Sequence, residues 1–84
     1  MTDATKDGIY FRIRHAEERF GPIVSTHEAL GVALEEFSEL QEQIRANNSL
    51  VVRAEALDLA AIMIRLAEAI ENESAIFMQR SFPK

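Results

Sequence analysis

Residues 25–40 read STHEALGVALEEFSEL, and this stretch decides which class of fold the chain adopts. Ser25 and Glu28 have the spacing of a capping box, in which a hydroxyl and a carboxylate each accept a hydrogen bond from a backbone N–H that the first helical turn leaves unpaired. Apolar side chains then recur at helical spacing along one stripe, formed by Leu30, Ala33, Phe37, Leu40 and Ile44. The pattern predicts a helix that begins beside Ser25 and ends near RANNS at residues 45–49, where two asparagines and a serine interrupt it.

The residues before this stretch also follow a helical period. One apolar stripe runs along Ile9, Ile13, Ala16 and Phe20. It predicts a first helix over residues 4–20. This helix is expected to end at Gly21, which suits the left-handed position after a helix, and at Pro22, which cannot continue one.

A third helix is expected after the interruption. Ser49 is placed to cap it, and its pattern spans residues 50–72, with room for one or two further turns in the segment AIFMQRSF. No stretch alternates polar and apolar residues as a half-buried strand does. The expected fold is all-α, a helical hairpin preceded by an N-terminal helix, and forms a single domain over residues 1–84.

The composition narrows the classes of function. The chain has 84 residues, no cysteine, and 14 acidic against 9 basic side chains, for a net charge of −5. Nucleic-acid binding depends on clustered Lys and Arg, so we expect no nucleic-acid partner. The chain contains no apolar run of about 18 residues, and MTDATKDG lacks the basic-then-apolar order of a secretion signal. We therefore expect a cytoplasmic protein with no membrane partner.

Four acids occur as two pairs of equal spacing, Glu36 with Glu39 and Glu55 with Asp58. A separation of three residues places each pair on one face of its helix. Glu55 lies within the apolar stripe of the third helix, where an unpaired carboxylate loses hydration worth several kcal/mol. We expect a positive group to meet these carboxylates.

A solvated acidic surface and a di-iron centre are the two alternatives to a simple cation site at these acids. Acids on helices are often solvated, and Glu42 before Arg45 fits that alternative. Against it stand the two matched pairs and the lack of any lysine between residues 7 and 83. A di-iron centre requires Glu-x-x-His pairs, and neither His15 nor His27 follows a glutamate at that spacing, so both are interpreted as surface or capping residues. Oxygen ligands alone favour Mg²⁺, or Mn²⁺ in its place.

EEFSE at residues 35–39, followed after fifteen residues by EALD at residues 55–58, resembles the E-E-x-x-E and E-x-x-D signature of the MazG-like, all-α nucleoside triphosphate pyrophosphohydrolases. The resemblance covers residues 25–70. It implies a Mg²⁺-dependent enzyme that cleaves an NTP or dNTP to the monophosphate and pyrophosphate. The metal ligands that it implies are Glu36, Glu39, Glu55 and Asp58. The chain departs from the family in being shorter than most members, in having no lysine after EALD, and in having at best an abbreviated fourth helix.

The implied chemistry gives further residues candidate roles. Glu39 or Glu35 would act as the base that accepts a proton from the attacking water, and the sequence does not separate them. Arg65 lies two turns beyond Asp58 on the same helix face and is the candidate for neutralising the leaving pyrophosphate, with a solvent-facing pairing with Glu68 as the alternative. For base recognition the sequence offers Tyr10, Phe11, Asn47 and Asn48. Core and loop positions are the alternative for these four.

The third helix carries a second apolar face, formed by Leu57, Ala60, Ala61, Ile64 and Ala67. A helix that is apolar on two sides must be covered on both, and a chain of this length has few residues with which to do so. We therefore expect a homodimer or homotetramer whose paired hairpins form a four-helix-bundle core. A non-catalytic helical oligomerisation or regulatory module that keeps an acidic hairpin is the alternative function.

Overall fold

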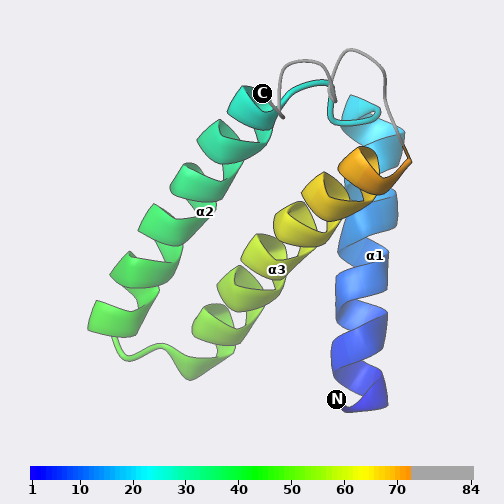
Figure 1. Ribbon diagram of the computed structural model, residues 1–84. Coiled ribbons are helices and arrows are strands. Elements are labelled where there is room, and N and C mark those ends of the chain that lie inside the picture. The colour runs from blue at the N-terminus through cyan, green and yellow to red at the C-terminus, as the bar shows by residue number, and fades with distance from the viewer. Residues whose placement is uncertain (73–84) are drawn as a thin grey trace.

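The computed structural model describes residues 1–72, and its regular structure is entirely helical (Figure 1). Helix α1 spans Asp3–Phe20, α2 spans Thr26–Arg45 and α3 spans Ser49–Glu71. Helices α2 and α3 form an antiparallel hairpin, and α1 packs along another side of α3 (Figure 1). The all-α prediction is confirmed for residues 1–72, and the extra turns expected in AIFMQRSF lie outside these residues. None of the three helices is long and apolar enough to cross a membrane.

The connection between α1 and α2 follows from local backbone and side-chain chemistry. Gly21 ends α1 with a φ of 76°, a conformation that glycine adopts without a steric penalty. The Ser25 hydroxyl accepts a hydrogen bond from the N–H of Glu28 at 3.0 Å, as the capping box predicts. The Glu28 carboxylate accepts from the N–H of Val24 at 2.9 Å, one residue earlier than in the standard box. These bonds fix the start of α2.

The turn between α2 and α3 is built from two asparagines. Asn47 has a φ of 56°, in the left-handed region that asparagine tolerates better than most residues. Asn48 caps α3, because its side chain accepts from the N–H of Val51 at 3.4 Å. The predicted cap at Ser49 was therefore wrong by one residue. Both asparagines serve the turn, which agrees with the loop alternative for them.

The buried core is small and lies where the connection after α1 meets the hairpin. Its fully buried members are Ile23, Ala29 and Ile62, and the partly buried residues packed against them are Ala33, Leu59, Leu66, Ala69 and Ile70. Helix α1 contributes no buried residue. The hairpin therefore supplies most of the apolar contacts, and α1 is held by fewer.

Helix α1 covers part of the second apolar face of α3. Leu57 and Ala61 are buried, and a Cβ atom placed on Gly8 of α1 would lie only 3.0 Å from Cδ1 of Leu57. The expectation that one chain could hardly cover both sides of α3 was thus wrong at these two positions. Ile64, expected at the centre of a subunit interface, remains 36% exposed in the single chain, so this part of the face is not covered by α1.

Gly31→Ala should stabilise the protein. Gly31 is exposed on α2, and an added Cβ would meet nothing within 4 Å. Alanine in a helix interior is favoured over glycine by about 1 kcal/mol, which corresponds to a rise in Tm of roughly 4–8 °C for a chain of this size. Circular dichroism melts check this.

Gly8→Ala is the matched control, because it gains the same helix propensity but crowds Leu57. Its gain should be smaller or reversed. A drop in Tm for Gly31→Ala would instead show that Gly31 is needed for a close contact with another chain.

Candidate metal centre

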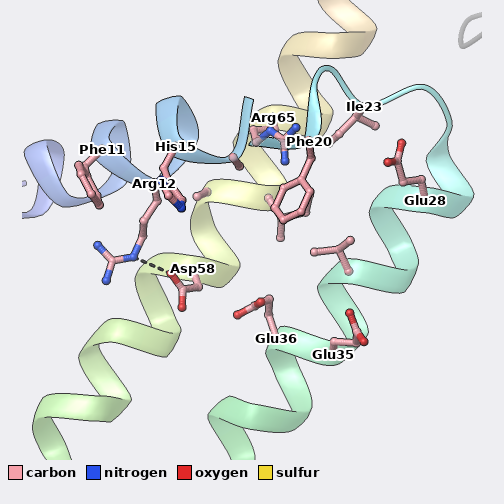
Figure 2. Close-up of a pocket in the computed structure, with 14 residues that line it drawn as sticks. Phe11, Arg12, His15, Phe20, Ile23, Glu28, Glu35, Glu36, Asp58 and Arg65 are labelled. Carbon is pink, nitrogen blue, oxygen red and sulfur yellow. Dashed lines mark hydrogen bonds and ion pairs between the residues drawn. The ribbon is translucent and has the colours of Figure 1, made fainter. Parts of the chain in front are cut away.

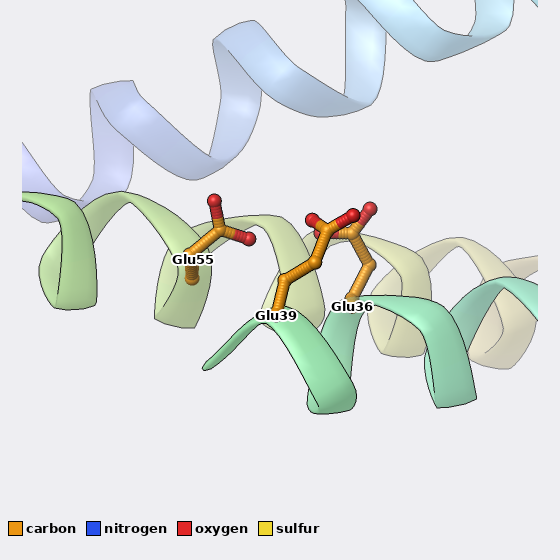
Figure 3. Close-up of side chains that lie close together, drawn as sticks. All are labelled: Glu36, Glu39 and Glu55. Atoms are coloured by element: carbon orange, nitrogen blue, oxygen red, sulfur yellow. The ribbon is translucent and has the colours of Figure 1, made fainter. Parts of the chain in front are cut away.

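Three carboxylates meet across the helical hairpin. Glu36 and Glu39 project from α2 toward Glu55 on α3 (Figure 3). One oxygen from each side chain lies within 4.8 Å of the other two. The spacing of three residues places the two α2 acids on one side of that helix, and the antiparallel pairing brings α3 alongside them. The structure thus brings together three of the four predicted metal ligands.

Two of these carboxylates each have one oxygen that is shielded from water and lacks a hydrogen-bonding partner among residues 1–72. Oε2 of Glu36 and Oε2 of Glu55 are both inaccessible and accept no hydrogen bond from residues 1–72, whereas Glu39 is exposed. A buried, unpaired carboxylate oxygen costs free energy that a proton or a cation would offset. Either a proton on these carboxylates or a cation between the helices would therefore lower the free energy of the folded protein.

The crowding of these acids also raises the pKa of two of them. Burial raises the pKa of Glu36 to about 7, and repulsion from Asp58 and then from Glu39, Glu55 and Glu35 adds to the effect. Burial also raises the pKa of Glu55, with further contributions from Glu39 and Asp58, while Arg12 opposes the increase. Like charges held this closely favour protonation in the absence of a cation.

These pKa values predict that the metal-free protein becomes more stable as the pH falls. Glu36 has an ordinary pKa of 4.5 and a folded pKa of about 7. The folded chain therefore binds more protons than the unfolded chain between these values, so the free energy of unfolding falls as the pH rises through this window. Thermal melts in chelator should give a higher Tm at about pH 5 than at about pH 8, by several degrees.

Glu36→Gln serves as the comparison for this pH dependence. Because glutamine cannot titrate, the variant should show a shallower decline of Tm with rising pH. Parallel curves for the wild type and Glu36→Gln would contradict the assignment of the raised pKa to Glu36.

Asp58 lies beside the cluster but is not part of the three-carboxylate group. Its Oδ1 accepts a hydrogen bond from Nε of Arg12 at 2.7 Å, and the two side chains form an ion pair between α3 and α1. The predicted four-ligand set is therefore not assembled in this structure, because an arginine holds the fourth carboxylate. Arg12 was missed as a site residue, since nothing local in the sequence links it to a residue 46 positions away.

Arg65 takes a different place from the one expected. It is buried, and its Nη2 donates a hydrogen bond to the carbonyl oxygen of Gly21 at 2.8 Å, so it ties the end of α1 to α3. Its solvent-facing alternative, a pairing with Glu68, was wrong. Arg65 still lines the cavity described next, together with Glu35, which is exposed.

A cavity of about 620 Å³ opens between α1 and the hairpin, next to the acids (Figure 2). Helix α1 lines it with Phe11, His15 and Phe20, and the hairpin contributes Glu36 and Asp58 at the acidic end. The rings of Phe11 and His15 stack with centroids 6.0 Å apart and an angle of 11° between their planes. The volume is within the range of small-molecule sites.

The cavity changes the interpretation of several aromatic residues. His15 is exposed, as predicted, but it also lines the cavity, and Phe20 was not foreseen as a site residue. Phe11 is 66% exposed rather than buried in a core. Tyr10 lines a separate shallow hollow on α1. Aromatic spacing along α1 was the one available signal for a ligand-facing helix.

No protein-family model, no curated protein and no solved structure matches this chain.

Proposed function

We propose that this protein is a Mg²⁺-dependent nucleoside triphosphate pyrophosphohydrolase that converts an NTP or dNTP to the monophosphate and pyrophosphate. The observation that carries the proposal is the convergence of Glu36, Glu39 and Glu55, with two buried oxygens that lack any partner among residues 1–72. The resemblance of EEFSE and EALD to the MazG-like signature supplies the reaction class.

The donor set fits a hard divalent cation. All three side chains offer carboxylate oxygen, which Mg²⁺ and Mn²⁺ prefer, and no sulfur or imidazole joins them among residues 1–72. Glu36, Glu39 and Glu55 would hold the ion. Asp58 would join them if Arg12 released it. Once bound, the ion would offset the charge of the triphosphate and lower the pKa of an attacking water.

Glu35 is the better placed of the two candidate bases. Glu35 lines the cavity and stands outside the three-carboxylate group, whereas Glu39 belongs to that group and would be engaged in holding the ion. In the proposed step, the water oxygen bonds to the α phosphorus, the bond from that phosphorus to the bridging oxygen breaks, and Glu35 accepts the proton of the water. Pyrophosphate leaves with the bridging oxygen.

The cavity would hold the nucleoside. It adjoins the acids through Glu36, and its aromatic wall on α1 suits the stacking of a planar base. Arg65 of α3, held by its bond to Gly21, would line the nucleoside cavity rather than point into open solvent. Because one of its nitrogens is already used in the fold, Arg65 has fewer donors left for the leaving pyrophosphate.

A homodimer is part of the proposal, through a different surface from that expected. Helix α2 exposes five large apolar side chains, and the four most exposed are Leu30, Leu34, Phe37 and Ile44, at 55%, 59%, 47% and 54%. Together with Gln41 they repeat at alternate steps of four and three residues, which is the spacing of a coiled-coil seam. We call these five residues the α2 seam. Two copies joined along it would form a four-helix core, and two such dimers would make the tetramer.

Product analysis tests the proposed function. The purified protein should release pyrophosphate and nucleoside monophosphate from at least one member of a panel of NTPs and dNTPs when Mg²⁺ is present, and chelator should stop the reaction. Hydrolysis in ¹⁸O-labelled water should place the label on the monophosphate. Release of inorganic phosphate, or label in pyrophosphate, would exclude attack at the α phosphorus.

The α2 seam favours the second candidate function, a non-catalytic oligomerisation or regulatory module. A seam of this kind needs a partner whether or not the acids bind metal. Failure of every nucleotide in the panel, together with a stable oligomer, would favour the module.

A further inference from the structure

An ion pair joins Asp58, which lies beside the three-carboxylate group, to α1. Arg12 donates from Nε to Oδ1 of Asp58 at 2.7 Å and from Nη1 to the carbonyl oxygen of Gly8 at 3.1 Å. The bond to Gly8 holds the guanidinium in place along its own helix. The Arg12 and Asp58 side chains are 26% and 37% exposed, so water reaches both and the pair can open.

Helix α1 packs against α3 through side chains that are at most partly buried. Its contacts with α3 include the Arg12–Asp58 pair, the approach of Gly8 to Leu57 and the bond from Arg65 to Gly21 at its end. Loss of the ion pair would therefore weaken the docking of the middle of α1 against α3.

The same ion pair competes with a cation for the Asp58 carboxylate. Asp58 is close enough to Glu36 and Glu55 for its charge to act on both. A divalent ion among the three glutamates would attract Asp58 as a further oxygen ligand and would repel the guanidinium that now holds it. The Asp58 carboxylate therefore cannot pair closely with Arg12 and coordinate the cation at the same time.

We propose that Arg12 is an internal counter-ion that competes with a divalent cation for Asp58, so that the docking of α1 and the loading of the metal centre oppose each other. This inference rests on the proposed cation site and adds a mode of regulation to it. By linkage, the factor by which docked α1 weakens metal binding equals the factor by which metal weakens the docking of α1. Anything that draws α1 away from α3 would load the site.

Calorimetric titration with Mn²⁺, without nucleotide, tests the competition. Arg12→Gln should bind Mn²⁺ more tightly than the wild type, by a factor in the range of about 5 to 150 that is typical of coupled sites. Arg14→Gln is the matched control: it removes the same charge from α1, but Arg14 pairs with Glu18 on the exposed side of that helix. It should stay close to the wild type.

The double variant Arg12→Gln/Asp58→Asn separates competition from simple repulsion. If Arg12 acts through Asp58, most of the gain in Mn²⁺ affinity should disappear when Arg12 is replaced in the Asp58→Asn background. An equal gain in both backgrounds would overturn the proposed competition. Circular dichroism spectra of all variants confirm that the compared proteins are folded.

Amide hydrogen exchange distinguishes the proposed competition from a ligand that only stabilises the fold, because such a ligand would slow exchange in all three helices. In the wild type, Mg²⁺ should slow exchange in α2 and α3 but accelerate it in α1, and Arg12→Gln should lose the acceleration. Slower exchange in all three helices would contradict the inference.

The outcomes distinguish this inference from the proposed function. Equal Mn²⁺ affinities for the wild type and Arg12→Gln would overturn the competition and leave the metal centre standing. An absence of saturable binding in both proteins would overturn the metal centre and the inference together. Binding by Arg12→Gln alone would support both.

Discussion

Glu55→Gln should abolish nucleotide hydrolysis while leaving the helices in place. Glu55 faces α2 from α3, and one of its oxygens is buried without a partner among residues 1–72. Glutamine has the same shape but lacks the charge that would hold a cation. Loss of outer partners of a metal ligand typically costs 10–100-fold, so loss of a ligand itself should reduce activity by more than about 100-fold.

The stability of this variant should change in the opposite direction. Glu55 carries a raised pKa because burial and the neighbouring acids disfavour its charge. Removal of that charge should raise the Tm of the metal-free protein and reduce the rise in Tm that Mg²⁺ produces in the wild type. Pyrophosphate release and thermal melts on the same sample measure both effects.

Glu42→Gln is the control that removes one negative charge from α2 without removing a proposed metal ligand. Glu42 lies on α2 and is exposed, and it does not belong to the three-carboxylate group. It should hydrolyse nucleotide at the wild-type rate. Equal losses in Glu42→Gln and Glu55→Gln would show that the general negative potential matters and that no defined site exists.

Phe37→Glu should dissociate the protein. Phe37 stands at the middle of the α2 seam and is 47% exposed in the single chain. If the seam joins two copies, the substitution buries an unpaired charge near a symmetry axis, at a cost of several kcal/mol in association free energy. An increase of about 3 kcal/mol would weaken the dimer more than 100-fold.

The separated chain should also lose helicity. Among residues 1–72 the buried apolar side chains are those of Ile23, Ala29, Leu57, Ala61 and Ile62. So small a core leaves little stability when the partner is removed. Sedimentation and circular dichroism should therefore show a smaller species with a lower Tm, and activity should fall although the acids remain.

Leu50→Glu is the matched control for this experiment. Leu50 is 84% exposed in the first turn of α3, outside the α2 seam, and a glutamate there is favourable near a helix N-terminus. It should behave as the wild type. A Phe37→Glu protein that remains folded and sediments as the wild type would contradict the seam as the subunit interface.

The helices could be predicted from the sequence because their ends are determined locally. The capping hydroxyl of Ser25 and the positive φ of Gly21 act within a few residues, and both appear in the structure where the pattern placed them. The one error, Ser49 in place of Asn48 as a cap, arose because adjacent polar residues compete for the same role.

The acidic centre was predictable to the extent that helical spacing determines it. Glu36 and Glu39 share a face because they are three residues apart, and Glu55 follows from the pairing of consecutive antiparallel helices. The partner of Asp58 was not predictable, since Arg12 reaches it from a helix whose position depends on tertiary packing.

The position of α1 was the main feature that the sequence left undetermined. Its apolar stripe predicted a helix but not which side of the hairpin it covers. The close approach of Gly8 to Leu57 and the bond from Arg65 to Gly21 select that side. The cavity lined by Phe20 and His15 follows from this placement, so the aromatic spacing along α1 could indicate a ligand-facing helix but not where the cavity lies.

Anomalous diffraction at the manganese absorption edge, from crystals grown with Mn²⁺, tests the proposed metal centre most directly. We expect an anomalous peak between α2 and α3, coordinated by oxygens of Glu36, Glu39 and Glu55. Crystals of Glu55→Gln should lose this peak or show it strongly reduced. The account would be contradicted if wild-type crystals grown with millimolar Mn²⁺ showed no anomalous peak at these three carboxylates.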